Sequence, residues 1–255
     1  MLKGKKIVLG VTGGIAVYKA VDLVSKLRKQ GAEVRVVMTE HAQQFVTPLT
    51  FKEISGNKVA VSMWNANQEF NVEHIALADW ADLFMVVPAT ANIIAKMTYG
   101  IADDLLSTTL LAAHSPVIVC PAMNTHMYEN PATQENIAKI KSRGIVVMPP
   151  ASGVLACGAV GAGRLPEPAD IVNFVKDFFA KTEGDMRGLK VLVTAAGTRE
   201  PIDPVRYVGN RSSGKMGYSI AQAAAERGAE VTLVTGPSAL TPPPNIKVVN
   251  VETTQ

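Results

Sequence analysis

The sequence has few cysteines and little net charge, and each shortage excludes a class of protein. Its 255 residues include only two cysteines, Cys120 and Cys157, which excludes a disulfide framework and a cysteine-rich zinc site. Two free thiols are typical of a reducing compartment, so we expect a cytoplasmic protein. The net charge is only +3, which gives no sign of a nucleic-acid-binding surface.

Long apolar runs are also missing. No run approaches the roughly 20 apolar residues that a membrane-spanning helix needs. The start, "MLKGKKIVLGVTGG", is basic, but its apolar run is short and opens into a glycine turn. We interpret it as a strand and not as a signal peptide. With 47% hydrophobic residues, the chain can still bury a sizeable core, and we expect neither a membrane nor a nucleic-acid partner.

Five short apolar runs predict strands. They are continuous and not alternating, as expected of parallel strands that are buried on both faces. A helix is predicted between the first two, because Val17, Val21, Val24 and Leu27 recur at helical spacing and Gly31 follows as a C-cap. Strand, helix and strand with short links indicate a parallel βαβ unit. The five predicted strands are 6–12, 33–39, 83–89, 116–122 and 145–150.

This pattern predicts two α/β domains. Residues 1–180 are expected to form a doubly wound parallel sheet of Rossmann-like type. A polar, glycine-bearing linker follows at 181–188. The motifs "RGLKVLVTAAGT" and "ERGAEVTLVTG" then repeat the earlier strand and turn pattern, which predicts the first part of a second Rossmann-like domain over 189–255. Two or three strands hardly complete a core, so we expect this chain to be a truncated piece of a longer protein.

The turn "VTGGIAVYK" at 11–19 is the first candidate binding motif. Gly13 and Gly14 stand between a strand and a helix N-terminus, where backbone N–H groups and the helix dipole favour a phosphate. The motif matches neither a dinucleotide site nor a P-loop, so a mononucleotide phosphate fits better. A plain tight turn explains the same residues, and both interpretations stay open.

Three strands end in small or polar segments on the side where such sheets bind ligands. Thr90 and Asn92 follow the third strand, and either capping or ligand binding explains them. Asp104 in "ADDLLSTT" has the same two explanations. The segment "PAMNTHMY" at 121–128 follows the fourth strand. These segments are therefore expected to meet at one edge of the sheet.

Single reactive side chains are ambiguous. His74, in "NVEHIALA", can point into the edge cleft, although a histidine is more often a surface residue. Cys120 lies within an apolar strand and is expected to be an inert small hydrophobe. Cys157 lies in the glycine- and alanine-rich stretch "ASGVLACGAVGAGRLPEP" at 151–168, which we interpret as a long binding loop or lid whose thiol can reach a substrate.

Taken together and in this order, "TGGIAVYK", "NVEHIALA", "PATANIIAKMTYGIADDLL", "PAMNTHMY" and "ACGAVGAGRLPEP" resemble the flavin-containing cysteine decarboxylase family. The segment "TREPIDPVRYVGNRSSGKMG" at 198–217 is similar to the opening of the ligase half in the bifunctional branch of bacterial coenzyme A biosynthesis. In that branch, phosphopantothenoylcysteine decarboxylase is fused to phosphopantothenate–cysteine ligase. The resemblance covers the whole chain. Two positions depart from the family pattern: Ala196 replaces a frequent glycine, and Tyr128 replaces a frequent tryptophan.

The resemblance implies an FMN-dependent decarboxylation of 4′-phosphopantothenoylcysteine to 4′-phosphopantetheine. The cysteine CH₂–SH carbon is first oxidised to a thioaldehyde with FMN as hydride acceptor, CO₂ then leaves, and the enethiolate is reduced again. His74 is implied as the base of the first half and Cys157 as the proton donor of the second. Asn124 is implied to bind the carboxylate that leaves as CO₂. FMN contacts are implied for Thr12, Gly13, Gly14, Ile15, Thr39, Pro88, Thr90, Ala91, Asn92 and Ser107, and substrate contacts for Met123, Met127, Ala156 and Arg164.

For the ligase half, the resemblance implies CTP-dependent acyl activation with Mg²⁺, followed by attack of cysteine. Asn210 is implied to stabilise the acyl-cytidylate, and Arg206 and Ser212 belong to the same phosphopantothenate-binding segment. No residue is assigned as a metal ligand. We expect this chain to decarboxylate without joining 4′-phosphopantothenate to cysteine.

The family also implies a homo-oligomer of trimeric units with flavin bound between subunits. Few aromatic residues and many small apolar ones suit a face buried against a second copy. Three alternatives are open: a decarboxylase of peptide C-terminal cysteine, a flavin prenyltransferase, and a non-enzymatic flavin-binding regulatory subunit. The ligase-like segment disfavours the first two, and the presence of both His74 and Cys157 disfavours the third.

Overall fold

The computed structural model describes residues 2–64, 72–154, 158 and 160–254. Their backbone contacts divide the chain into two compact units, Leu2–Val172 and the residues from Asn173 on. The division falls inside helix α9 (Pro168–Glu183). Within the described residues, no helix is long and apolar enough to cross a membrane.

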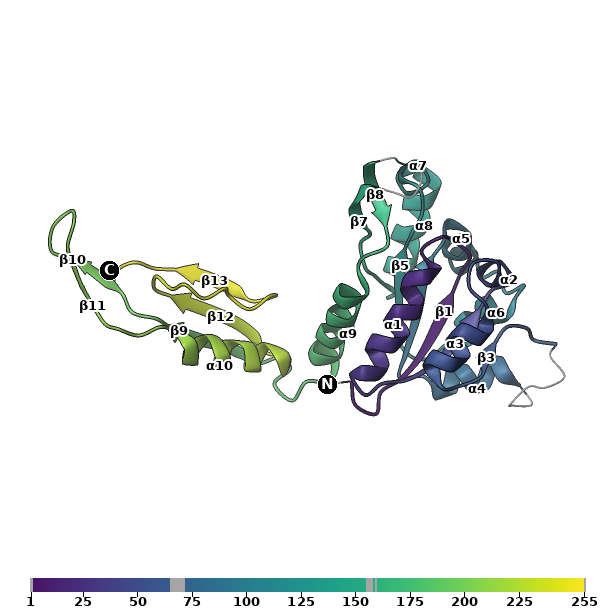
Figure 1. The fold of residues 1–255 in the computed structure, drawn as a ribbon, viewed down its shortest axis with the longest axis horizontal. Helices are drawn as coiled ribbons and strands as arrows, with labels where there is room; N and C mark the ends of the chain where they lie inside the picture. The colour runs from purple at the N-terminus through teal and green to yellow at the C-terminus, as the bar shows by residue number, and fades with distance from the viewer. Residues whose placement is uncertain (1, 65–71, 155–157, 159, 255) are drawn as a thin grey trace. The chain divides into compact units, whose positions relative to one another are not determined.

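A parallel six-stranded sheet forms the centre of the first unit (Figure 1). Its spatial order, β3-β2-β1-β4-β5-β6, is that of a doubly wound α/β fold, as the sequence predicts. The chain starts in the middle, winds outward to β3 and then returns to build the other half from β4. The strands are β1 (Lys6–Val11), β2 (Glu33–Met38), β3 (Val59–Ala60), β4 (Leu83–Ala89), β5 (Val117–Pro121) and β6 (Val146–Val147).

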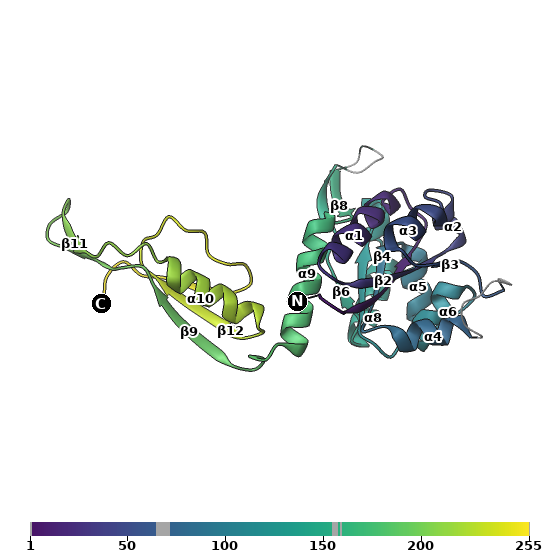
Figure 2. The ribbon, with the colours of Figure 1, turned by 60° about the horizontal axis from the view of Figure 1, so that its bottom comes forward.

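Helices cover both faces of this sheet (Figure 2). Leu77, Ile94, Leu106 and Ile140 come from four different helices and share one buried cluster with strand residues such as Val86. The continuous apolar pattern of the strands follows from this double cover, and every residue of β4 is buried. The helices are α1 (Val17–Lys29), α2 (Glu40–Gln43), α3 (Pro48–Ser55), α4 (Glu73–Trp80), α5 (Ala91–Tyr99), α6 (Leu105–Ala112), α7 (Thr125–Glu129) and α8 (Pro131–Ser142).

Two details differ from the sequence prediction. The strand predicted at 145–150 has only Val146–Val147 in the sheet. The glycine-rich stretch predicted as a loop is an antiparallel hairpin in its described parts, with β7 (Ala151–Val154) paired to β8 (Val160–Arg164). Glycines normally weaken a strand prediction because they pack no side chain, and here they permit close backbone contacts that are described below.

The second unit has a parallel three-stranded sheet of order β13-β12-β9, from β9 (Lys190–Ala195), β12 (Glu230–Thr235) and β13 (Lys247–Asn250). Helix α10 (Lys215–Glu226) joins β9 to β12 in a βαβ arrangement. A small antiparallel hairpin, β10 (Arg199–Pro201) with β11 (Tyr207–Gly209), precedes α10. Ala196, which stands where the family often has glycine, has φ +62°, a left-handed conformation that glycine adopts without strain.

Candidate active site

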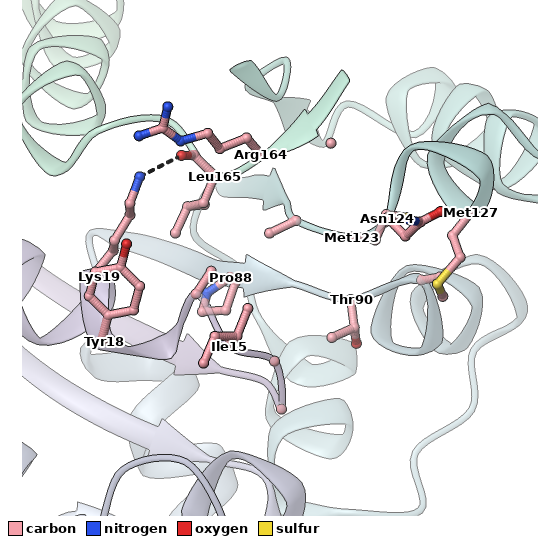
Figure 3. A pocket seen from close by; sticks show the side chains of 16 residues that line it. Ile15, Tyr18, Lys19, Pro88, Thr90, Met123, Asn124, Met127, Arg164 and Leu165 are labelled. Carbon is pink, nitrogen blue, oxygen red and sulfur yellow. Dashed lines mark hydrogen bonds between the residues drawn. The ribbon is translucent and has the colours of Figure 1, made fainter. Parts of the chain in front are cut away.

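A cavity of about 660 Å³ lies at the carboxyl ends of β1, β4 and β5 (Figure 3). The spatial order places β1 beside β4, so the winding direction of the sheet reverses between them. In doubly wound folds this switch point is the usual ligand site. The cavity is lined by Gly13, Gly14, Ile15, Ala16, Tyr18, Lys19, Pro88, Thr90, Ala91, Ala122, Met123, Asn124, Met127, Gly163, Arg164 and Leu165.

The two glycines after β1 have different surroundings. A Cβ atom on Gly13 would stand 2.5 Å from the Cβ atom and 2.9 Å from the carbonyl carbon of His41, so no side chain fits there. A Cβ atom on Gly14 would meet nothing within 4 Å among the residues that the structure describes. Gly13 therefore permits close packing against α2, whereas Gly14 faces open space at the entrance to α1. Open space and a helix N-terminus together suit an anionic group.

Thr12 connects the two strands on either side of the switch point. Its buried hydroxyl donates to the carbonyl oxygen of Pro88 at 2.7 Å and accepts from the backbone N–H of Thr90 at 3.1 Å. Pro88 and Thr90 lie 76 and 78 positions after Thr12 in the sequence. Thr12 is not among the cavity-lining residues, and its hydroxyl fixes the position of Pro88 and Thr90, which are.

The segment after β4 combines capping with exposure to the cavity. Thr90 is the N-cap of α5, where its Oγ1 accepts from the backbone N–H of Ile93 at 3.4 Å. Pro88, Thr90 and Ala91 all line the cavity. Asn92 is exposed in the first turn of α5 and lies outside the lining. The two explanations for Thr90 are therefore compatible with each other.

The segment after β5 supplies the amide group. Asn124 is the N-cap of α7, and its Oδ1 accepts from the backbone N–H of His126 at 2.9 Å. The other end of the amide, Nδ2, is a hydrogen-bond donor. Met123 and Met127 flank it at the cavity, and both side chains offer an adaptable apolar surface. Figure 3 shows Asn124 and Met127 on one side of the cavity.

A group of charged residues lies at the other side of the cavity in Figure 3. The Nζ atom of Lys19 donates to the carbonyl oxygen of Leu165 at 3.1 Å and to Oε1 of Glu167 at 2.9 Å. Arg164 donates to the same Oε1 atom at 2.6 Å. The hydrogen bond from Lys19 is the main cause that holds the pKa of Glu167 below its usual value. Two cations share one carboxylate, so this side of the cavity has a positive surplus.

Sequence reasoning missed Lys19 and predicted Arg164. The side chain of Lys19 is only 8% exposed. A lysine is almost never buried unless it has a partner. Its position on the apolar face of a predicted helix, four residues before Leu23, is the signal that marks it. Its partners, Leu165 and Glu167, lie 146 and 148 positions away, so no local pattern reveals them.

Several predicted residues lie away from the cavity lining. Thr39 is the N-cap of α2 and accepts from the backbone N–H of Ala42. Ser107 is buried in a capping box with Asp104 and borders a smaller cavity of about 180 Å³. His74 is half-buried in the first turn of α4. Ala156 and Cys157 lie outside the described residues.

Cys120 has the buried environment that the sequence predicts. It is a free cysteine in β5, fully buried. Burial raises the pKa of its thiol to about 12. The thiol therefore stays neutral at physiological pH and acts as a small apolar side chain.

Two of the three predicted ligase residues lie together in the second unit. Oδ1 of Asn210 accepts from the backbone N–H of Ser212 at 2.9 Å. Asn210 also lies directly against Gly197, which has no space for a side chain. Arg206 belongs to the turn of the β10–β11 hairpin, where its Nε donates to Asp203 at 2.6 Å. Its side chain is exposed.

Known proteins resemble both parts of this chain. Residues 186–255 match the family described as "DNA/pantothenate metabolism flavoprotein C-terminal domain". The coenzyme A biosynthesis bifunctional protein CoaBC of Haemophilus influenzae is 51% identical over 254 residues, which cover all of this chain and 63% of that protein. The protein of the same name from Bacillus subtilis is 50% identical over 244 residues, covering 95% of this chain and 60% of the relative. The chain thus spans about 63% or less of the length of these two relatives.

Solved structures resemble the first unit. A PPC decarboxylase mutant complexed with pantothenoylaminoethenethiol is 31% identical with a TM-score of 0.62, covering 69% of this chain and 99% of that one. The FMN binding protein AtHal3 is 31% identical with a TM-score of 0.60, covering 69% and 97%. Residues 1–180 match the family described as "Flavoprotein". This match, the fold and the cavity at the switch point together show that the chain belongs to the Flavoprotein family.

Proposed function

We propose that the domain over residues 1–180 binds FMN and decarboxylates 4′-phosphopantothenoylcysteine to 4′-phosphopantetheine. One observation carries the proposal: a single cavity joins the open glycine turn after β1 to the amide of Asn124 after β5. The resemblance to CoaBC proteins and to a PPC decarboxylase structure supports the same function.

The residues present suit FMN. A cavity of about 660 Å³ is within the range of roughly 300–1,000 Å³ that is usual for cofactor sites. Gly14 offers unfilled space at a helix N-terminus, where a phosphate is stabilised. Ile15, Pro88 and Met123 offer apolar surface for a flat ring system. Gly14 and Thr90 would hold polar parts of the cofactor, and when bound it would supply reversible hydride acceptance.

Asn124 would hold the substrate carboxylate through Nδ2. An amide donates to a carboxylate but carries no fixed positive charge. A fixed positive charge would stabilise the bound carboxylate and so oppose its loss as CO₂. His74 would take the thiol proton, and Cys157 would return a proton to the carbon chain. Arg164 would contact the substrate at the positive side of the cavity, where the 4′-phosphate is a suitable partner.

We also propose that copies of this chain assemble, with the site completed by a neighbouring copy. His74 lies outside the cavity lining of its own chain, so a base from a second copy would supply the missing group. Ile15 and Tyr18 line the cavity and are each 61% exposed, which suits a surface that a neighbour covers. Size-exclusion chromatography with light scattering tests this. A monomer that binds FMN tightly and decarboxylates would contradict it.

For the second unit, we propose a role in phosphopantothenate–cysteine ligation with CTP and Mg²⁺. Support comes from the family match of residues 186–255 and from the contact between Asn210 and Gly197. Asn210 and Ser212 would contact the activated acyl group. Release of CMP in the presence of 4′-phosphopantothenate, cysteine, CTP and Mg²⁺ measures whether this chain ligates by itself.

The decisive experiment on the first unit compares the wild-type chain with Asn124→Ala after reconstitution with FMN. The wild type is expected to be yellow and to release CO₂ from 4′-phosphopantothenoylcysteine. The variant should bind FMN equally well and lose roughly 10²-fold in kcat/KM, because the carboxylate loses its donor. A peptide with a C-terminal cysteine serves as the competing substrate. Preference for that peptide, or FMN binding without CO₂ release, would contradict the proposal.

A further inference from the structure

Strand β8 lies unusually close to the segment that carries Asn124. The backbone N–H of Met123 donates to the carbonyl oxygen of Gly163 at 3.0 Å. Gly163 has φ +129°, and a Cβ atom on it would collide with the carbonyl oxygen of Met123. A Cβ atom on Gly161 would stand 2.7 Å from both Cγ2 and Oγ1 of Thr125. The two glycines therefore let β8 approach this segment as closely as backbone atoms allow.

Thr125 contributes volume to this contact. It directly follows Asn124, forms the first residue of α7 and is only 9% exposed. Its Oγ1 atom has no hydrogen-bond partner within the part of the chain that the structure describes. A buried hydroxyl without a partner does not favour folding. What Thr125 provides is a branched side chain that fills the space above Gly161.

The contact connects two walls of the cavity. One wall is Asn124 with its neighbours, and the other is the end of β8 with Gly163 and Arg164. Because Thr125 is covalently next to Asn124, a displacement that shifts the Thr125 backbone also moves the N-cap. The alternative response is an outward movement of β8, which displaces the opposite wall. Either response changes the distance across the cavity.

We infer that Gly161 is a positioning residue, which acts through Thr125 to place the Asn124 amide for the substrate carboxylate. This inference rests on the proposed decarboxylation. A misplacement of about 1 Å at a reacting group costs on the order of 10²-fold in rate. The effect of a methyl group at position 161 therefore depends on the bulk at position 125 and disappears when that bulk is removed.

A double-mutant cycle in the full chain with FMN tests the inference. The variants are Gly161→Ala, Thr125→Ala, Thr125→Val and the two doubles. Gly161→Ala is expected to lower kcat/KM roughly 10- to 100-fold, with the larger part in kcat and with FMN affinity unchanged. Thr125→Ala alone should lower kcat/KM by a smaller factor, about three- to tenfold, because it leaves the space above Gly161 unfilled. The double with Thr125→Ala should recover to about the same level, because the two Thr125 atoms at 2.7 Å from the new methyl group are gone and the Cβ atom of residue 125 lies at 3.3 Å.

Thr125→Val is the matched control, because valine keeps both γ positions of threonine and loses only the hydroxyl. The double of Gly161→Ala with Thr125→Val should remain as impaired as Gly161→Ala. Gly163→Ala is the second control: its obstacle is the backbone carbonyl of Met123, so Thr125→Ala should not rescue it.

The outcomes separate this inference from the proposed function. An inactive wild-type chain would contradict the decarboxylation itself. With an active wild type, near-normal activity of Gly161→Ala, or equal impairment of both doubles, would overturn the positioning role. If Gly161→Ala alone does not fold, restored folding and activity in the double with Thr125→Ala supports the role, and a double that stays unfolded overturns it.

Discussion

At the scale of single residues, Gly13 and Gly14 show that adjacent glycines are needed for different reasons. Gly13 is confined by the backbone and Cβ atom of His41. No atom of the described residues lies within 4 Å of a Cβ position on Gly14, which borders the cavity. A sequence pattern reports only that two glycines follow a strand, whereas the neighbouring atoms distinguish a packing glycine from a ligand-facing one.

This difference predicts that alanine at position 13 lowers stability, whereas alanine at position 14 weakens FMN binding. Gly13→Ala should lower the free energy of unfolding by about 1–3 kcal/mol, because the new methyl group overlaps His41. Gly14→Ala should leave the apo-protein Tm within about 2 °C of wild type and weaken FMN binding at least about tenfold, because the methyl group takes up the space proposed for the phosphate. Thermal unfolding and flavin fluorescence measure the two effects. Equal losses of stability in both variants would refute the distinction.

At the scale of elements, the start of α6 combines a cap with an ion pair. Oδ1 of Asp104 accepts from the backbone N–H of Ser107 at 2.8 Å, and Lys96 donates to Asp104 at 2.8 Å and pairs with Asp103 at 2.6 Å. Burial by itself raises the pKa of Asp104, but the hydrogen bonds from Lys96 and Ser107 outweigh it, and the pKa is lowered. The folded state therefore favours the charged carboxylate.

Replacing Asp104 should reveal these contributions separately. Asp104→Ala removes the cap and should lower the free energy of unfolding by about 1–2 kcal/mol. Asp104→Asn keeps a capping oxygen and loses the charge, so it should cost less, about 0.5 kcal/mol, since Lys96 keeps Asp103.

The pH dependence of the asparagine variant follows from the lowered pKa. A carboxyl whose pKa is depressed on folding stabilises the protein above its unfolded pKa of roughly 4. This contribution is lost as the pH falls through the folded value. The difference between wild type and Asp104→Asn in urea unfolding should therefore be full at pH 7 and shrink as the pH falls below about 4. A difference that grows on acidification would contradict the assignment.

At the scale of the whole molecule, the two units have cores of different quality. Every residue of β4 in the first unit is buried. In the second unit, Leu192 on β9 is 68% exposed and Val249 on β13 is 36% exposed. Its buried cluster consists of Val193, Tyr218, Ala221, Ala224, Val231 and Leu233. A smaller buried apolar area gives less resistance to local opening.

Hydrogen exchange should show this difference directly. After correction for intrinsic rates, backbone amides of β9 and β12 are expected to exchange at least about tenfold faster than those of β1 and β4 in the full chain. Mass spectrometry of peptic peptides resolves the four strands. Helix α10 provides an internal comparison, because its buried face packs on the same small cluster and should exchange as β12 does. Equal protection of the two sheets would show that the exposed apolar residues do not weaken the second unit.

The sequence by itself determined the local elements and their chemistry. Continuous apolar runs identified β1, β2, β4 and β5, because strands buried on both faces need them. It also placed Thr90 and Asn124 at strand ends, where capping and ligand binding use the same residue types. Only the tertiary structure decided which ends meet. It set β1 beside β4, joined Lys19 to Leu165 across 146 positions, used Ser107 as a cap and left His74 outside the cavity lining. The physical reason is that the hydrophobic pattern and the intrinsic propensities of a few neighbouring residues determine a helix or a strand. The close approach of two distant segments, such as that of Gly161 to Thr125, depends on tertiary packing, which no local pattern encodes.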